Sequence, residues 1–118
     1  MIMEQKIFDL SLLEQMNDQL FLRQLVDLYL EDTPADLYEM SRAMENGDLD
    51  IVAKKAHKLK SSTGMLKALP FLHLLEQIES LIRNKISTPE IYELVQCAPQ
   101  EFYRLKKALH KYLQLLPA

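Results

Sequence analysis

Residues 56–64 read Ala56-His57-Lys58-Leu59-Lys60-Ser61-Ser62-Thr63-Gly64, and this stretch is the most informative part of the chain. Apolar residues recur around it at helical spacing, which places His57 at the edge of a buried helix face, tilted toward solvent. The small residues Ser61 and Gly64 leave room for a partner near the ring. Histidine can act as a nucleophile and titrates near neutral pH. An open imidazole without a predicted substrate pocket indicates a group carrier rather than a complete enzyme.

Length and composition favour one packed helical domain. The chain has 118 residues, 48% of them hydrophobic and only two of them glycine, which fits a single all-α domain over residues 1–118. The lone cysteine, Cys97, excludes a disulfide framework and a cysteine-based zinc site. Neither a signal peptide nor an apolar run near the roughly 20 residues of a membrane span is found. We therefore expect a cytoplasmic protein that does not enter a membrane.

Charge is divided unevenly along the chain. The net charge is −3, of which residues 1–50 contribute −9 (three basic, twelve acidic) and residues 51–118 contribute +6 (eleven basic, five acidic). Lysines flank His57 on both sides, so its surroundings attract an anion or an acidic partner. Nucleic-acid binding is not expected, because the basic residues near His57 lack interleaved aromatics and the whole chain is acidic.

Capping residues and apolar spacing predict the helices. The expected helix boundaries are Asp9 or Ser11, Asp18, Gly47 followed by Asp48, Pro70, and Thr88. The long second helix is predicted to continue through Pro34 because its apolar phase survives there. The fourth is predicted to turn Leu72, Leu75, Ile78 and Ile82 inward. Short loops between long helices predict an antiparallel up-and-down four-helix bundle with a short extra N-terminal helix.

Residues 56–68 resemble the motif of the histidine-containing phosphotransfer (HPt) domains of two-component phosphorelays. That motif is roughly Ala-His-x-Leu-Lys-Gly-Ser-(Ser/Ala)-x-x-Leu-Gly-Ala, and this chain has Ser61 and Lys67 at two positions where the family usually has glycine. Residues 21–34 resemble the family's second helix. The resemblance extends from about Asp9 to Ile82 and implies that the whole chain is one such domain.

The resemblance implies that His57 accepts a phosphoryl group on Nε2 from the aspartate of a receiver domain and passes it to another receiver. Receiver domains of response regulators or hybrid kinases would be the partners, and they would supply the aspartate and Mg²⁺. The chain itself is then expected to be no enzyme, to hold no metal or cofactor, and to act as a monomer.

Counting back from the predicted turn near residue 68 places Glu79 opposite His57 and Glu76 opposite Lys60. A carboxylate that accepts the Nδ1 proton would orient the ring and leave Nε2 as the nucleophile. We therefore expect Glu79 to orient the histidine, and Lys60 to contact the phosphoryl oxygens or the partner unless Glu76 pairs with it. Ser61 and Gly64 are expected to lie against the partner. Candidates for an exposed docking patch around them are Leu22, Leu30 and Met65.

Other functions remain open at this point. A helical docking module of HPt shape, never phosphorylated, is the main alternative. A kinase or phosphatase acting alone would need an ATP-binding region for which the helices leave no place. A haem or metal bundle would need inward Glu-x-x-His pairs, and His73 and His110 have no partner at ligand spacing.

Overall fold

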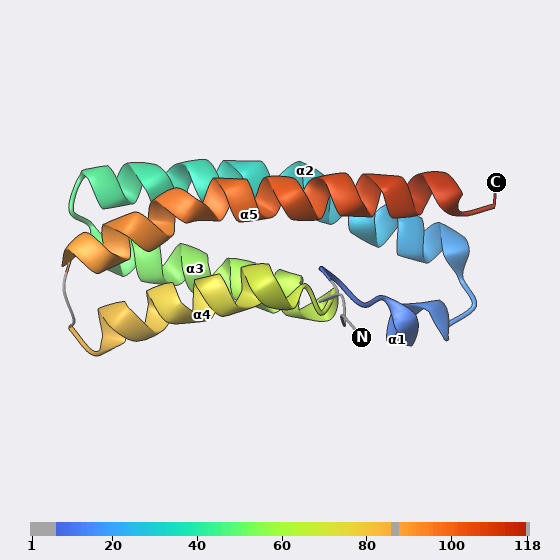
Figure 1. Ribbon diagram of the computed structural model, residues 1–118, viewed down its shortest axis with the longest axis horizontal. Helices are drawn as coiled ribbons and strands as arrows, with labels where there is room; N and C mark the ends of the chain where they lie inside the picture. The colour runs from blue at the N-terminus through green and yellow to red at the C-terminus, as the bar shows by residue number, and fades with distance from the viewer. Residues whose placement is uncertain (1–6, 86–87, 118) are drawn as a thin grey trace, which may run out of the picture.

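The computed structural model describes residues 7–85 and 88–117, and these form five helices. In chain order the helices are α1 (Ser11–Glu14), α2 (Gln19–Glu45), α3 (Leu49–Met65), α4 (Leu69–Arg83) and α5 (Thr88–Leu115). Figure 1 shows α2 and α5 side by side, with α3 and α4 beneath them and α1 near the end where the C-terminus lies. Each long helix packs against its neighbours in the ring α2–α3–α4–α5. The predicted all-α up-and-down four-helix bundle with a short N-terminal helix is therefore confirmed.

The predicted capping residues explain where the helices begin. The side chain of Asp18 accepts a hydrogen bond from the Phe21 amide at 2.9 Å, and Asp48 accepts one from Ile51 at 3.3 Å. Each bond satisfies an amide that the first helical turn leaves without a partner. Between them, Gly47 adopts a φ of +74°, the left-handed conformation that lets the chain reverse directly from α2 into α3.

The connection between α3 and α4 includes a position where the chain departs from the family motif. Lys67 has a φ of +48°, in the region that favours glycine. This turn also holds the N-terminal segment, because the Asp9 amide donates to the Leu66 carbonyl at 3.0 Å. The side chain of Asp9 in turn accepts from the Ser11 amide at 3.0 Å, so Asp9, rather than Ser11, satisfies the start of α1.

One contiguous core fills the space between the four long helices. Its fully buried members include Val26 and Met40 of α2, Leu59 of α3, Leu75 of α4 and Leu109 of α5. In α4 the prediction was right for Leu75 and Ile78, whereas Leu72 and Ile82 are only half-buried and Phe71 and Leu74 take core positions. The difference arises because α4 packs against both α3 and α5, which widens its apolar stripe beyond a single row.

A buried hydrogen bond ties α2 to α3 near the C-terminal end of α3. The Tyr29 hydroxyl lies 2.8 Å from the Thr63 hydroxyl, and Thr33 donates to the Tyr29 carbonyl at 2.6 Å. Burial raises the pKa of Tyr29 to about 12, against the opposing effect of these hydroxyls. Tyr29 thus stays protonated and serves as a neutral, hydrogen-bonded strut between two helices.

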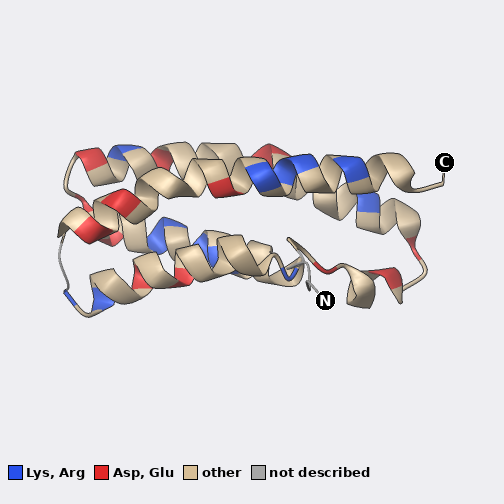
Figure 2. Cartoon of the chain, viewed as in Figure 1, with Lys and Arg blue, Asp and Glu red and all other residues tan. Residues whose placement is uncertain are grey.

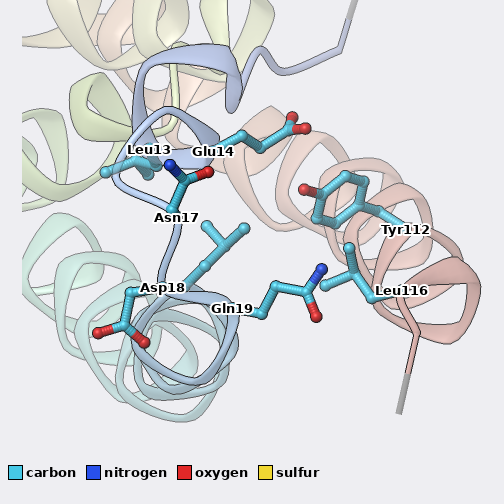
Figure 3. A pocket seen from close by; sticks show the side chains of 8 residues that line it. Leu13, Glu14, Asn17, Asp18, Gln19, Tyr112 and Leu116 are labelled. Atoms are coloured by element: carbon cyan, nitrogen blue, oxygen red, sulfur yellow. The ribbon is translucent and has the colours of Figure 1, made fainter.

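The N-terminal segment closes one end of the bundle, where α1 packs against α2 and Phe8, just before α1, packs on α5. The rings of Phe8 and Tyr112 meet edge to face with centroids 5.6 Å apart, and Leu10 is buried. Figure 3 shows Glu14 of α1 and Tyr112 of α5 lining the same hollow at this end. Burial, and then the nearby Glu14 carboxylate, raise the pKa of Tyr112. The contacts at this end of the bundle are packing contacts, and they do not involve His57.

Candidate functional site

His57 lies on α3 and makes one specific contact, with Glu79 of α4. Its Nδ1 is 3.0 Å from Glu79 Oε1, while 65% of the imidazole side chain is exposed, against 21% of the Glu79 side chain. A carboxylate accepts only, so a neutral ring donates its proton from Nδ1 and keeps its lone pair on Nε2. The arrangement therefore presents a nucleophilic nitrogen whose ring is held at its other nitrogen.

Glu79 also holds Lys60, which differs from the expected pairing. The Lys60 ammonium lies 2.9 Å from Glu79 Oε2, so the expectation that Lys60 faces Glu76 was wrong. Glu76 and Glu79 lie one helical turn apart, and the flexible lysine side chain spans that distance, which a count along the hairpin cannot resolve. Lys60, and to a smaller extent His57, lower the pKa of Glu79 against the opposing effect of burial. Glu79 is thus held as an anion between two cationic or proton-donating groups.

Figure 2 places the basic residues of α3 alongside acidic residues of α4 across this contact. The ion pair with Glu79 keeps Lys60 close to His57 and compensates the positive charge of its ammonium group. A new anion on the exposed ring would compete with Glu79 for the same ammonium.

A largely apolar groove of about 330 Å³ runs between α2 and α3 on the other side of His57. Ser61 and Met65 line it from α3, and Leu28 and Asp32 line it from α2. Met65 and Leu28 are 52% and 54% exposed, so apolar side chains are open to a partner here. Gly64 is half-buried on the same helix, and a Cβ added there would meet nothing within 4 Å. Any need for glycine at this position therefore has to come from outside the bundle.

The expected docking patch was partly wrong. Leu22 and Leu30 are 2% and 8% exposed and belong to the core, whereas Leu28, which was not predicted, takes their place on the surface. The two buried leucines share the inward phase of α2 with Val26, and that phase was visible in the sequence. Leu28 lies outside this phase, which was the available signal for its exposure.

A second carboxylate near His57 escaped the sequence analysis altogether. Asp36 of α2 is buried, and its Oδ1 accepts from Lys55 at 3.3 Å and from Lys58 at 3.0 Å. Lys55 also pairs with Glu39, which together with Asp36 raises the pKa of Lys55 against desolvation. An acidic residue within the inward phase of α2, opposite a helix with lysines three residues apart, was the signal that could have found it.

Within residues 7–85 and 88–117, no three histidine, cysteine, aspartate or glutamate side chains come together as a metal site. His73 and His110 are both exposed, and His73 lies in a hollow with Lys60 and Glu79. None of the described helices combines the length and apolar character needed to cross a membrane.

Comparison with known proteins adds one finding. A family model described as "Hpt domain" matches residues 24–116, which include His57, Lys60, Glu79 and the groove. No curated protein and no solved structure matches the chain.

Proposed function

Because this chain belongs to the Hpt domain family, whose members carry phosphoryl groups on histidine in phosphorelays, we propose that His57 is its phosphoacceptor. The observation that supports this choice is the 3.0 Å contact from Nδ1 to Glu79 on a ring that is 65% exposed. Neither His73 nor His110 has a carboxylate partner among the described residues. Of the three histidines, all within the described residues, only His57 is exposed and also has its ring oriented by a carboxylate.

We propose a transfer in which Nε2 attacks the phosphorus of a receiver's aspartyl phosphate. The N–P bond forms as the P–O bond to the aspartate breaks, and the aspartate leaves as a carboxylate. The ring then carries a proton on Nδ1 and a phosphoryl group on Nε2, and the Glu79 carboxylate stabilises the positive charge that this places on the imidazole. Passing the group to a second receiver reverses these steps, with an aspartate oxygen as the nucleophile.

In this proposal the chain contributes position and charge, and the receiver contributes the rest of the chemistry. Phosphoryl transfer depends mainly on alignment and on compensation of the equatorial oxygens' charge. Lys60 supplies a cation one turn from His57, and the receiver supplies its aspartate and divalent ion, as the family resemblance implies. Domains of this family are phosphocarrier modules, and we propose that this chain has no catalysis of its own.

The groove between α2 and α3 is the proposed docking surface for receivers. Leu28 and Met65 offer apolar contact beside His57, and Ser61 and Gly64 keep the approach open. Ser61 adds one hydroxymethyl group where the family usually has glycine, so it is expected to narrow the range of receivers rather than to prevent transfer. We further propose that residues 1–118 act as one domain, as a monomer, and in the cytoplasm.

The test is transfer from a purified receiver domain, phosphorylated with a labelled small-molecule phosphodonor, to the chain and to its His57→Gln variant. The matched controls are His73→Gln and His110→Gln, which replace the two other exposed histidines. We expect acid-labile, alkali-stable label on the wild type and both controls and none on His57→Gln. Absence of label on the wild type across a panel of receivers would instead favour a docking module of HPt shape. Label that persists on His57→Gln would show that another residue is the acceptor.

A further inference from the structure

The C-terminal half of α5 carries a concentration of positive charge that the proposed transfer does not use. No acidic residue follows Glu101, whereas Arg104, Lys106, Lys107 and Lys111, together with His110, fall within eight positions. Figure 2 shows this as a basic segment of α5 that continues beyond the last acidic residue of the helix. The chain as a whole is acidic, so this half of the helix stands out against its surroundings.

The basic residues share one outward face. Arg104, Lys107, His110 and Lys111 are all exposed, while Leu105 and Leu109 on the opposite side of the helix are buried. Lys107 and Lys111 are one turn apart, and Tyr103 and Leu115 lie one further turn out at either end. Tyr103 and Leu115 are 59% and 76% exposed. The face therefore reads apolar, basic, basic, apolar along about 18 Å of helix.

Most of this charge is unpaired within the described residues. Arg104 pairs with Glu101 at 3.3 Å, and Lys107 lies 5.5 Å from the centre of the Tyr103 ring. For Lys111, no acidic side chain among residues 7–85 and 88–117 comes within ion-pair distance. Stabilisation of the helix dipole does not explain these basic residues either. That effect is confined to the last turn of a helix, and the last turn of α5 has no basic residue.

The face also lies away from the proposed transfer site. His57 is on α3, and α5 packs against α2 and α4, its neighbours in the ring, so the outer face of α5 and the groove beside His57 belong to different sides of the bundle. A partner bound to α5 would leave His57 accessible to a receiver.

We propose that this face of α5, from Tyr103 to Leu115, docks an acidic amphipathic helix of a partner protein. Two carboxylates one turn apart on such a helix match Lys107 and Lys111, and apolar residues one turn further out match Tyr103 and Leu115. A nucleic acid fits less well, because a phosphate backbone makes no use of the exposed leucine and the net charge of −3 repels it beyond the stripe. The partner would hold the carrier in place while His57 exchanges its phosphoryl group.

The test uses the full chain and a fluorescein-labelled 20-residue helical peptide with the pattern Leu, Glu, Glu, Leu at successive four-residue intervals. A second peptide replaces both glutamates with lysine. The variant is Lys107→Glu with Lys111→Glu, and its matched control is Arg42→Glu with Lys85→Glu, the same charge change at exposed positions elsewhere. Circular dichroism confirms that each variant is folded, and fluorescence anisotropy measures affinity at low and high salt.

We expect the acidic peptide to bind the wild type and the control alike, and to bind the Lys107→Glu, Lys111→Glu variant at least about tenfold more weakly. Binding should weaken with salt, and the lysine peptide should not bind.

The proposal is overturned if the acidic peptide fails to bind or binds all three chains equally. It is also overturned if duplex DNA or anionic vesicles bind the stripe more tightly than the peptide. A dimer of the chain that dissociates on Lys107→Glu, Lys111→Glu would assign the face to a second copy, through acidic residues such as Asp27 and Glu31. Receiver transfer to His57 is measured separately and does not affect any of these outcomes.

Discussion

Two carboxylates flank α3, and each binds two basic side chains of that helix. Glu79 on α4 holds the imidazole of His57 and the ammonium of Lys60, at 3.0 and 2.9 Å. Asp36 on α2 holds the ammonium groups of Lys55 and Lys58, at 3.3 and 3.0 Å. The two clusters use the same device on opposite sides of the same helix. They differ in burial, since 9% of the Asp36 side chain is exposed against 21% of the Glu79 side chain.

The more important difference is in what the carboxylates hold. Both partners of Asp36 are lysines, which stay charged at neutral pH and can do no more than fix α2 against α3. One partner of Glu79 is an imidazole, which can act as a nucleophile and form a new bond at its free nitrogen. A carboxylate that only holds a partner in place contributes to a reaction when that partner itself reacts, as an imidazole can and these lysines do not. We therefore propose that the Glu79 cluster serves the reactive histidine and that the Asp36 cluster serves stability.

The largest expected effect comes from removing the Glu79 side chain. Glu79→Ala leaves the His57 ring without its hydrogen-bond acceptor, so we expect the rate of transfer from a receiver to fall about 10- to 100-fold. Glu79→Gln keeps an acceptor oxygen for Nδ1 and loses only the charge, so its rate should lie between those of Glu79→Ala and the wild type. Rapid-quench transfer from a labelled receiver measures all three.

The control for this series is Glu76→Ala, which removes a carboxylate one turn away on the same helix. It should transfer at the wild-type rate, because Lys60 pairs with Glu79. Equal rates for Glu79→Ala and the wild type would remove the distinction between the two clusters.

The second effect is on stability and concerns Asp36. Asp36→Asn removes the charge that holds Lys55 and Lys58, and we expect the free energy of unfolding to fall by about 1–2 kcal/mol. The loss is limited because Lys58 can move into water. Transfer to His57 should change by less than about twofold, since Asp36 does not contact the ring. Urea denaturation measures the stability.

Glu39→Gln serves as the comparison for Asp36→Asn, because Glu39 also pairs with Lys55 but is exposed. It should cost less than about 0.5 kcal/mol, as surface pairs do. A fall in transfer rate for Asp36→Asn that matches the fall for Glu79→Ala would mean that both clusters act on the histidine.

The sequence predicted the Glu79 cluster better than the Asp36 cluster, for a physical reason. Helices and their boundaries follow from local rules: Asp18, Gly47 and Asp48 act within one turn of themselves. The pairing of His57 with Glu79 needed only one further fact, that α3 and α4 form a short-looped hairpin. Asp36 is no farther along the chain from its partners, at 19 and 22 residues against 22 for His57 and Glu79. Its burial, however, depends on how closely α2 and α3 pack, which apolar spacing alone does not specify.

The same limit explains the errors around the groove. The exposure of Leu28 and the burial of Leu30 depend on the rotation of α2 about its axis, which several neighbouring helices set together. Lys60 was placed opposite Glu76 because a hairpin count locates a side chain only to within a helical turn. Residues with flexible side chains, and residues at the edge of a buried stripe, are therefore where the sequence predicted least.

The third prediction separates stability from chemistry. Lys67 has a φ of +48°, so Lys67→Gly removes backbone strain and should raise the free energy of unfolding by about 0.5–1 kcal/mol. Lys54→Gly, the same change inside α3, should lower it by about 1 kcal/mol. Transfer should stay at the wild-type rate for Lys67→Gly. If transfer instead rises with stability, the losses seen in the Glu79 series would reflect folding rather than the orientation of His57.

The smallest expected effect is a pH dependence confined to the Glu79 cluster. Lys60 and His57 lower the pKa of Glu79 in the folded chain, so the unfolded chain binds the proton more readily. The stabilisation that results is present above the ordinary glutamate pKa and is lost as the pH falls through the lowered value. The stability difference between the wild type and Glu79→Gln should therefore be largest near neutral pH and shrink toward acid pH, which urea denaturation across that range measures. A difference that grows on acidification would mean that Glu79 gains a proton on folding, and the carboxylate could not then be the group that stabilises a charged imidazole.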